Sequence, residues 1–209
     1  MTTPDEIRAE LLRVTKRAYF QDKMFAATSG NLSVFDRASG RMYITPSSYP
    51  YEDMTEADLM VVDLDGNILE GPHRPSSEWR MHAAVYRGLA RVNAVVHTHS
   101  PYATAFAINA APIPAVLFEQ VYFIGGDIPV AARAVPSTPA VGENCVAALR
   151  DREGCLMANH GALAVGATLA EAYTRAVYIE DAAKAYALAI AAGRPQVIPQ
   201  EEVEAYLNL

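Results

Sequence analysis

Two short apolar segments that end at histidine constrain the fold of this chain more than any other feature of its sequence. Residues 93–97 read Asn-Ala-Val-Val-His and continue into Thr-His, and residues 155–159 read Cys-Leu-Met-Ala-Asn and continue into His-Gly. Such runs are typical of strands buried inside a sheet. Because His97 and His99 are two residues apart, their side chains lie on the same face of an extended chain. The segments predict a central sheet whose edge collects the imidazoles of His97, His99 and His160.

Helical patterns surround these strands along the chain. We expect a first helix from Pro4 to about residue 26, because Pro4 suits the first helical position after Thr3. Further helices are expected after Pro75 and over residues 101–109, 138–150 and 168–192, with strands over 31–35, 41–45, 59–63, 67–70 and 162–165. The irregular alternation of hairpins and helices favours a three-layer α/β/α sandwich over a strict βαβ repeat. At 209 residues, we expect one domain over residues 1–209.

The charge balance and the cysteine count exclude several classes of protein. The chain carries 17 Lys and Arg against 24 Asp and Glu, a formal charge of −7, whereas nucleic-acid and anionic-membrane binders need the opposite excess. No apolar run approaches the ~20 residues that span a bilayer, and the N-terminus lacks a signal-peptide pattern. Cys145 and Cys155 are too few for a disulfide framework and are expected to be buried. We therefore expect a cytoplasmic protein without nucleic-acid or membrane partners.

His97, His99 and His160 are the strongest candidates for a chemical site. A single His-x-His pair is more often structural, but a third histidine at a second strand end favours a catalytic metal site. Three neutral imidazoles leave a divalent ion with its full charge, which suits a Lewis acid for an oxygen-bearing substrate. Zinc fits this ligand set best, with manganese and cobalt as alternatives. His82, four residues after Glu78, either supports a ligand or is a buried core histidine.

Three segments rich in Ser, Thr, Asn and Gly precede the histidine pair. They read Thr-Ser-Gly-Asn-Leu-Ser at 28–33, Ile-Thr-Pro-Ser-Ser at 44–48 and Pro-Ser-Ser-Glu-Trp at 75–79. Each alone is typical of a turn or a helix N-cap, but together they offer hydroxyl and backbone donors that hold an anion without Lys. We therefore expect a phosphate pocket. Glu78, directly after two serines, is a general base, a fourth metal ligand or a favourable charge in a first helical turn.

The order of these motifs resembles the class II aldolase/adducin family. The three serine-containing segments, Val-Val-His-Thr-His-Ser at 95–100 and Asn-His-Gly at 159–161 carry the resemblance, which covers roughly residues 5–190. Within the family, the pattern is most similar to that of the L-fuculose-1-phosphate aldolases. The resemblance implies an α/β/α sandwich with a mostly antiparallel central sheet. It also implies a homotetramer with active sites at subunit interfaces.

The resemblance assigns roles to individual residues. It implies that His97, His99 and His160 bind zinc, and that Glu78 is a ligand or the catalytic base. It implies a phosphate site formed by Gly30, Asn31, Ser47, Ser48, Ser76 and Ser77. A tyrosine that serves as proton donor is expected in the segment 118–126. Tyr122 takes that role across the subunit interface, or the proton comes from another group.

The reaction implied is cleavage of a ketose 1-phosphate into dihydroxyacetone phosphate and an aldehyde. Positive charge on the metal would stabilise the enediolate that forms when the C3–C4 bond breaks. Epimerases of the family usually have aspartate where Glu78 stands, so this glutamate favours carbon–carbon cleavage. The alternatives are a pentulose-phosphate 4-epimerase, a phospho-sugar dehydratase or decarboxylase, and a non-catalytic adducin-like binding domain.

Overall fold

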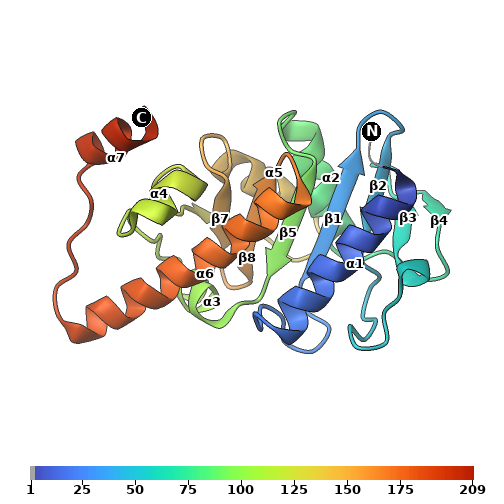
Figure 1. The fold of residues 1–209 in the computed structure, drawn as a ribbon, viewed down its shortest axis with the longest axis horizontal. Helices are drawn as coiled ribbons and strands as arrows, with labels where there is room; N and C mark the ends of the chain where they lie inside the picture. The colour runs from blue at the N-terminus through green and yellow to red at the C-terminus, as the bar shows by residue number, and fades with distance from the viewer. Residues whose placement is uncertain (1–2) are drawn as a thin grey trace.

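A single eight-stranded sheet runs through the computed structural model, which describes residues 3–209 (Figure 1). Its strands are β1 (Asn31–Asp36), β2 (Arg41–Ile44), β3 (Met60–Val62), β4 (Ile68–Glu70), β5 (Ala94–Thr98), β6 (Val130–Ala131), β7 (Gly154–Met157) and β8 (Gly161–Gly166). They lie in the order β4-β3-β2-β1-β5-β8-β7-β6. Every neighbouring pair is antiparallel except β6 and β7, which are parallel. This confirms the mostly antiparallel sheet and the two predicted hairpins before residue 71.

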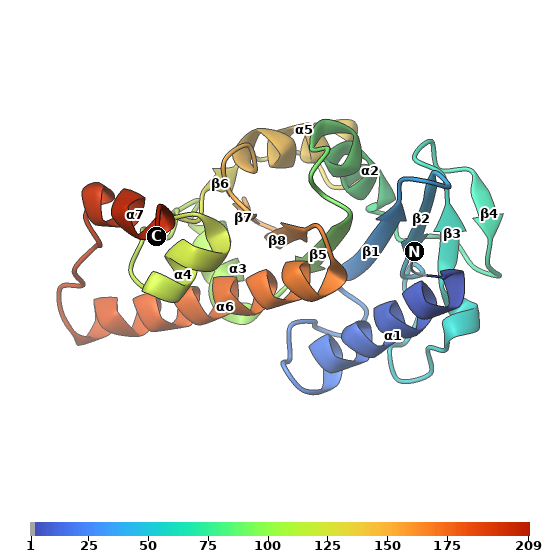
Figure 2. The same ribbon diagram turned by 45° about the horizontal axis from the view of Figure 1, so that its top comes forward.

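Helices cover both faces of the sheet, which makes the predicted three-layer α/β/α sandwich (Figure 2). The helices are α1 (Pro4–Phe20), α2 (Trp79–Gly88), α3 (Pro101–Ile108), α4 (Phe118–Ile124), α5 (Pro139–Ala148), α6 (Leu169–Ala192) and α7 (Gln200–Leu207), with a 3-10 turn η1 (Glu56–Asp58). α2 and α5 pack together on one face, whereas α1, α3 and α6 lie on the other. Among residues 3–209, no helix combines the length and the apolar character needed to cross a membrane.

Two apolar cores fill the spaces between the layers. Adjacent residues of β5 point to opposite faces, so Val96 packs in the core beneath α1 and α6 while Val95 packs in the core beneath α2 and α5. Both residues are fully buried, which explains why this strand has no alternation of polar and apolar side chains. Cys145 and Cys155 are buried free thiols in the second core, as expected.

The first helix is shorter than the sequence predicted. Thr3 and Glu6 form a capping box at its start, with the Glu6 amide donating to the Thr3 hydroxyl at 3.3 Å. The helix ends at Phe20 rather than near residue 26, because Lys23 adopts a left-handed backbone with φ of 53°. The chain then turns back toward the sheet, and the Met24 carbonyl accepts a hydrogen bond of 3.1 Å from the His99 amide. The early helix end therefore brings the 24–30 loop to the end of β5.

The sequence reading did not assign α4 or α7 as helices. These two short helices pack on each other through Ala115, Val121 and Val203. Phe118 and Tyr206 add an aromatic contact with ring centroids 5.1 Å apart. Both helices lie together at one end of the molecule, where α4 packs against α6 (Figure 1).

Candidate active site

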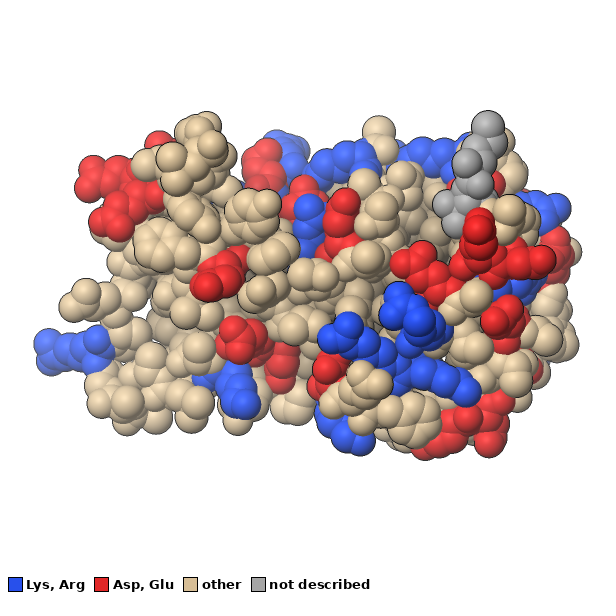
Figure 3. Space-filling view, viewed as in Figure 1, with Lys and Arg blue, Asp and Glu red and all other residues tan. Residues whose placement is uncertain are grey.

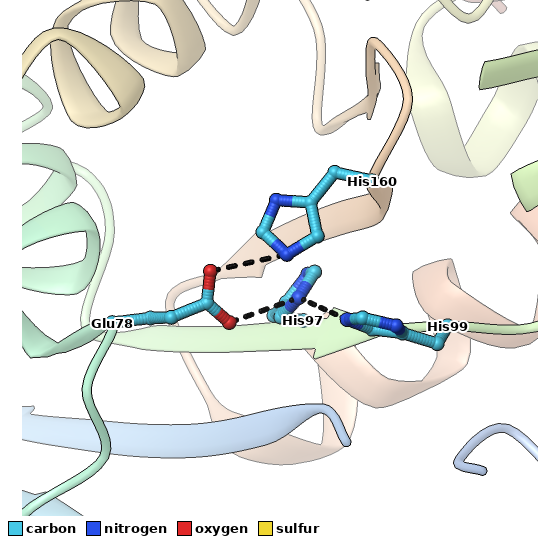
Figure 4. A group of neighbouring side chains, drawn as sticks. All are labelled: Glu78, His97, His99 and His160. Atoms are coloured by element: carbon cyan, nitrogen blue, oxygen red, sulfur yellow. Dashed lines mark hydrogen bonds and ion pairs between the residues drawn. The ribbon is translucent and has the colours of Figure 1, made fainter. Parts of the chain in front are cut away.

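The ends of β5 and β8 bring the three predicted histidines together. In the antiparallel pairing of these strands, Thr98 lies opposite Ala162, so the end of β5 adjoins the turn that carries His160. Gly161 is required there, because a Cβ atom on it would lie 2.2 Å from the Thr98 carbonyl oxygen. The three rings point toward one another in Figure 4.

Glu78 completes a cluster of four side chains. It is the N-cap residue of α2 and does not use its side chain to cap the helix, so its carboxylate is free to extend toward the histidines. One ligand atom from each of Glu78, His97, His99 and His160 lies within 4.8 Å of every other. Glu78 Oε2 is 3.1 Å from His97 Nε2, and Glu78 Oε1 is 3.2 Å from His160 Nε2. The sequence left several roles open for Glu78, and the structure places its carboxylate among the three imidazoles.

Hydrogen bonds orient the rings so that their lone pairs converge. His97 Nδ1 lies 2.9 Å from the Ala162 carbonyl oxygen, which can only accept, so Nδ1 carries the proton. Nε2 is therefore the His97 nitrogen that faces the centre of the cluster and is available to a metal ion. Burial lowers the pKa of His99 to about 4 and also lowers that of His160. Both effects favour neutral imidazole, the form that binds metals.

The donor set fits a divalent cation. Glu78 Oε1 is buried and accepts no hydrogen bond among the described residues, and such orphaned acceptors are rare in folded proteins unless an ion satisfies them. Burial alone would raise the pKa of Glu78, but His97, His160 and Asn31 outweigh it and hold the pKa below its ordinary value. One carboxylate and three imidazoles are ligands that zinc and other first-row metals accept. The cluster can therefore bind a divalent metal.

A polar cavity of about 230 Å³ adjoins the cluster and contains every position predicted for phosphate. Its walls include Glu78, His99 and His160, together with the predicted set Gly30, Asn31, Ser47, Ser48, Ser76 and Ser77. Thr28, Ser29, Pro136 and Ser137 also line it, and the last two were not predicted from the sequence. Segments that are far apart in the chain thus form one pocket. No Lys or Arg lines it.

Backbone geometry explains why these segments form a pocket. Gly30 has φ of 79°, and a Cβ atom there would lie 2.4 Å from a ring carbon of Phe25, so only glycine fits. The Ser47 amide donates to the Arg74 carbonyl at 2.9 Å, and the Ser76 amide donates to the Thr45 carbonyl at 3.0 Å. These bonds join the two serine turns. Asn31 is fixed by the sheet, since it pairs with His97 across β1 and β5.

The structure places Tyr122 away from this pocket within one chain. Tyr122 lies on α4, is 66% exposed, and borders a separate hollow of about 460 Å³ with Glu171 and Arg175 of α6. Phe118, at the start of α4, is 45% exposed. An exposed tyrosine on this helix is free to contact another molecule, so its predicted role across a subunit interface remains a proposal.

Sequence reasoning also missed the group of polar residues buried behind the cluster. Asn31 and Ser33 on β1 contact His82 of α2 through side-chain hydrogen bonds of 2.5 and 2.6 Å. His82 is fully buried and bonds to Asn31, which contacts Glu78. It is therefore a core histidine that also contacts a partner of the cluster, so the two roles expected from the sequence do not exclude each other. The spacing of Asn31 and Ser33, two apart on a strand, was the available signal, because such residues share a face.

Acidic and basic side chains mix over the face that carries α1 and α6 (Figure 3). The net charge of −7 does not decide whether the pocket can take an anion, because its hydroxyl and amide groups do not enter that count and could donate to an anion. The fold and the site define a class of protein: an α/β/α sandwich whose His and Glu cluster can bind a divalent metal beside a serine-lined polar pocket.

Comparisons with known proteins identify the family within this class. The model described as Class II Aldolase and Adducin N-terminal domain matches residues 9–187. The 5-methylthioribulose-1-phosphate/5-deoxyribulose-1-phosphate aldolase of Rhodospirillum rubrum is 38% identical over 181 residues, covering 87% of this chain and 80% of that protein. The L-fuculose phosphate aldolase of Escherichia coli O6:H1 is 38% identical over 182 residues, covering 87% and 83%. A solved L-fuculose 1-phosphate aldolase superposes with a TM-score of 0.93 at 36% identity, covering 99% of this chain and 97% of that chain.

The chain therefore belongs to the class II aldolase/adducin family. The relatives compared above are named aldolases, and the chain is an enzyme of the lyase class. This confirms the family and the enzyme class expected from the motif order.

Proposed function

We propose that this enzyme is a zinc-dependent aldolase that cleaves a ketose 1-phosphate into dihydroxyacetone phosphate and an aldehyde. The observation that carries the proposal is the position of Glu78, which belongs both to the four-residue cluster and to the wall of the serine-lined pocket. A substrate whose phosphate occupies the pocket would present its nearest carbons to the cluster. The relatives support the proposal, because their names refer to 1-phosphates or phosphates of ketoses.

The pocket would bind the phosphate and orient the substrate. Ser47, Ser48, Ser76 and Ser77 supply hydroxyl groups, and Gly30 and Asn31 supply further donors at the same wall. Binding energy from a phosphate far from the reacting bond can be used to orient that bond. We therefore assign these six residues to substrate binding rather than to the chemical step.

His97, His99, His160 and Glu78 would hold the zinc ion, with manganese or cobalt as substitutes. When bound, a divalent cation supplies positive charge beside the carbonyl and hydroxyl oxygens, where negative charge develops as the C3–C4 bond breaks. Glu78 would deliver the proton that C3 gains when its bond to C4 breaks, since its Oε1 accepts no hydrogen bond among the described residues. That proton comes from the C4 hydroxyl, whose oxygen becomes the aldehyde oxygen. A carboxylate in this place is a general base within reach of the substrate.

The proposal includes a homotetramer in which Tyr122 of a neighbouring subunit is the proton donor to the aldehyde oxygen in the condensation direction. In cleavage, the same tyrosine would pass on the proton that leaves the C4 hydroxyl. Its support is the exposure of Tyr122 and Phe118 on α4, since exposed aromatic side chains are typical of protein interfaces. Light scattering after size exclusion tests the assembly, and Tyr122→Phe tests the role. A monomer with full activity would overturn this part of the proposal. We also place the reaction in the cytoplasm, where the free thiols Cys145 and Cys155 stay reduced.

A coupled assay tests the proposed reaction. The zinc-loaded enzyme is incubated with 5-methylthioribulose 1-phosphate, 5-deoxyribulose 1-phosphate and fuculose 1-phosphate, and dihydroxyacetone phosphate is detected with glycerol-phosphate dehydrogenase and NADH. We expect turnover of at least one ketose 1-phosphate, and loss of that turnover after chelation with recovery on adding zinc. Absence of turnover on a wide panel of ketose phosphates would contradict the proposal.

A further inference from the structure

A continuous line of buried hydrogen bonds leads from the carboxylate of Glu78 into the core between β1 and α2. Asn31 Nδ2 is 2.9 Å from Glu78 Oε2, and Asn31 Oδ1 is 2.5 Å from His82 Nε2. His82 Nδ1 is 2.6 Å from Ser33 Oγ, which is 2.6 Å from the Tyr86 hydroxyl. Asn31, Ser33, His82 and Tyr86 are each at most 4% exposed. None of these groups therefore exchanges its partner for water easily.

The positions of these residues on β1 and α2 determine which of their side chains are in contact. Asn31 and Ser33 are two apart on β1 and share one face of the strand, whereas His82 and Tyr86 are four apart on α2 and share one face of the helix. The ring of His82 lies between the two residues of β1 and contacts each with a different nitrogen. A side chain with two polar atoms on opposite edges is needed at this position.

The chemistry of Glu78 fixes the direction of the first two hydrogen bonds. An ionised carboxylate only accepts, so Asn31 donates through its NH₂ group and turns its carbonyl oxygen toward His82. That oxygen also only accepts, so His82 Nε2 carries a proton and donates to it. The tautomer of His82 and the orientation of the Asn31 amide therefore depend on each other.

The remaining hydrogen bonds, from His82 to Tyr86, have donors and acceptors in the same order. Burial lowers the pKa of His82 to about 3, so its ring is neutral and Nδ1 has a lone pair. The Ser33 hydroxyl donates to that lone pair, and the Tyr86 hydroxyl donates to Ser33. Each donor thus points toward the carboxylate, and hydrogen bonds aligned in this way strengthen one another.

We propose that His82 is a positioning residue, which holds the Asn31 amide with its NH₂ group toward Glu78 and thereby fixes the carboxylate at the metal cluster. Without His82, the amide could rotate by 180° and place its oxygen against the carboxylate, which would repel Glu78 from its position. Glu78 Oε1 would then no longer face His160 at 3.2 Å. The effect on turnover rests on the proposed function, whereas the hydrogen-bond arrangement does not.

The hydrogen-bond arrangement is tested by NMR on the metal-free enzyme, independently of any activity. Long-range ¹⁵N–¹H spectra are expected to show His82 with its proton on Nε2 and none on Nδ1. The side-chain amide signals of Asn31 are expected to shift in His82→Phe and to stay near their wild-type positions in His82→Gln, whose amide can replace the Nε2 donor. A proton on Nδ1 of His82, or unchanged Asn31 signals in His82→Phe, would overturn the proposal.

The kinetic test uses three variants that each alter the buried line. His82→Phe is expected to lower kcat about 10–100-fold, the usual effect of losing a partner behind a site, and His82→Gln is expected to restore most of it. Tyr86→Phe is the matched control, because it removes the most distant hydroxyl from the same buried group and is expected to change kcat less than threefold, or about 0.6 kcal/mol. Thermal unfolding identifies any variant that fails to fold.

The pattern of results separates this proposal from the proposed function. Equal losses of kcat in His82→Phe and Tyr86→Phe would show that the line is merely structural and would overturn the positioning role. If the wild-type enzyme cleaves no ketose phosphate while the NMR results are as expected, the proposed function fails and the positioning of Asn31 and Glu78 by His82 stands.

Discussion

The Nε2 atoms of His97 and His99 lie 3.0 Å apart, although His97 has its proton on the opposite nitrogen, where it donates to Ala162. His99 in its Nε2–H tautomer donates a hydrogen bond to the lone pair on His97 Nε2. Burial lowers the pKa of His99 to about 4, so its ring is neutral near pH 7 and a metal ion would take the place of the proton between the two nitrogens. The pair therefore offers two neutral imidazole nitrogens to a bound cation.

The first prediction concerns metal content. His97→Ala and His160→Ala are each expected to lose stoichiometric metal and activity together, because each variant leaves only two of the three imidazole ligands. Metal analysis of the purified variants by mass spectrometry measures this directly. His73→Ala is the matched control, since His73 pairs with Asp58 outside the cluster and its loss is expected to leave metal content unchanged. Full metal occupancy in His97→Ala would contradict the assigned ligand set.

Glu78→Gln is expected to retain the metal but lose most of the rate. Three histidine ligands remain, whereas an amide cannot take up the proton that the proposed base moves. The expected decrease in kcat is about 10²–10⁴-fold, as is typical when a general base is removed. Steady-state kinetics together with metal analysis test this prediction, and a Glu78→Gln enzyme with wild-type kcat would remove Glu78 from the mechanism.

Substitutions in the anion pocket are expected to act mainly on substrate binding. Ser47→Ala and Ser77→Ala each remove a hydroxyl from the pocket wall, and a hydrogen bond to a charged group contributes about 1.5–3 kcal/mol. We expect KM to rise about 10–100-fold in each variant, with a smaller change in kcat. Ser39→Ala serves as control, because Ser39 bonds to Asp36 in the turn after β1. An unchanged KM in both pocket variants would argue against phosphate binding there.

The Asp58–His73 pair predicts how stability depends on pH. His73 Nε2 lies 2.8 Å from Asp58 Oδ1, and hydrogen bonds from His73 and Thr55 lower the pKa of Asp58 to about 2. Because this pKa is below the ordinary 3.8, the folded state binds fewer protons than the unfolded state. The stabilisation is therefore complete above about pH 4 and is lost as the pH falls toward 2.

Asp58→Asn tests this pH dependence. At pH 7 the substitution is expected to lower the free energy of unfolding by about 1–2 kcal/mol, because the hydrogen bonds to a charged acceptor are lost. The difference between variant and wild type is expected to shrink between pH 4 and pH 2. Urea unfolding at several pH values measures both quantities, and a difference that stays constant down to pH 2 would contradict the assignment.

The sequence was sufficient to predict the three histidines and the serine segments, because strand periodicity and turn composition can be recognised from a few neighbouring residues. His97 and His99 follow from the period of a strand, and His160 follows from the turn between β7 and β8. The serine segments combine turn residues with hydroxyl donors, so the 230 Å³ cavity could be expected from their joint occurrence. Each motif depends on a few neighbouring residues, whereas the meeting of the serine segments in one cavity depends on contacts between distant parts of the chain.

Features that depend on distant contacts could not be predicted in the same way. The first helix ends at Phe20, and the loop that follows Lys23 bonds through Met24 to His99, a contact between distant parts of the chain. α4 and α7 are short and are stabilised by packing on each other, through Val121 and Val203. The role of Asn31 required knowledge of the register between β1 and β5 as well as the position of α2.

The central claim is that this enzyme breaks a carbon–carbon bond in a ketose 1-phosphate. NMR of the product mixture, with ¹³C-labelled substrate and the zinc-loaded enzyme, tests it most directly. The account predicts that dihydroxyacetone phosphate and an aldehyde form in equal amounts, and that neither forms with His97→Ala. An isomer with an intact carbon skeleton would show an epimerase, released carbon dioxide would show a decarboxylase, and either result would contradict the proposed cleavage.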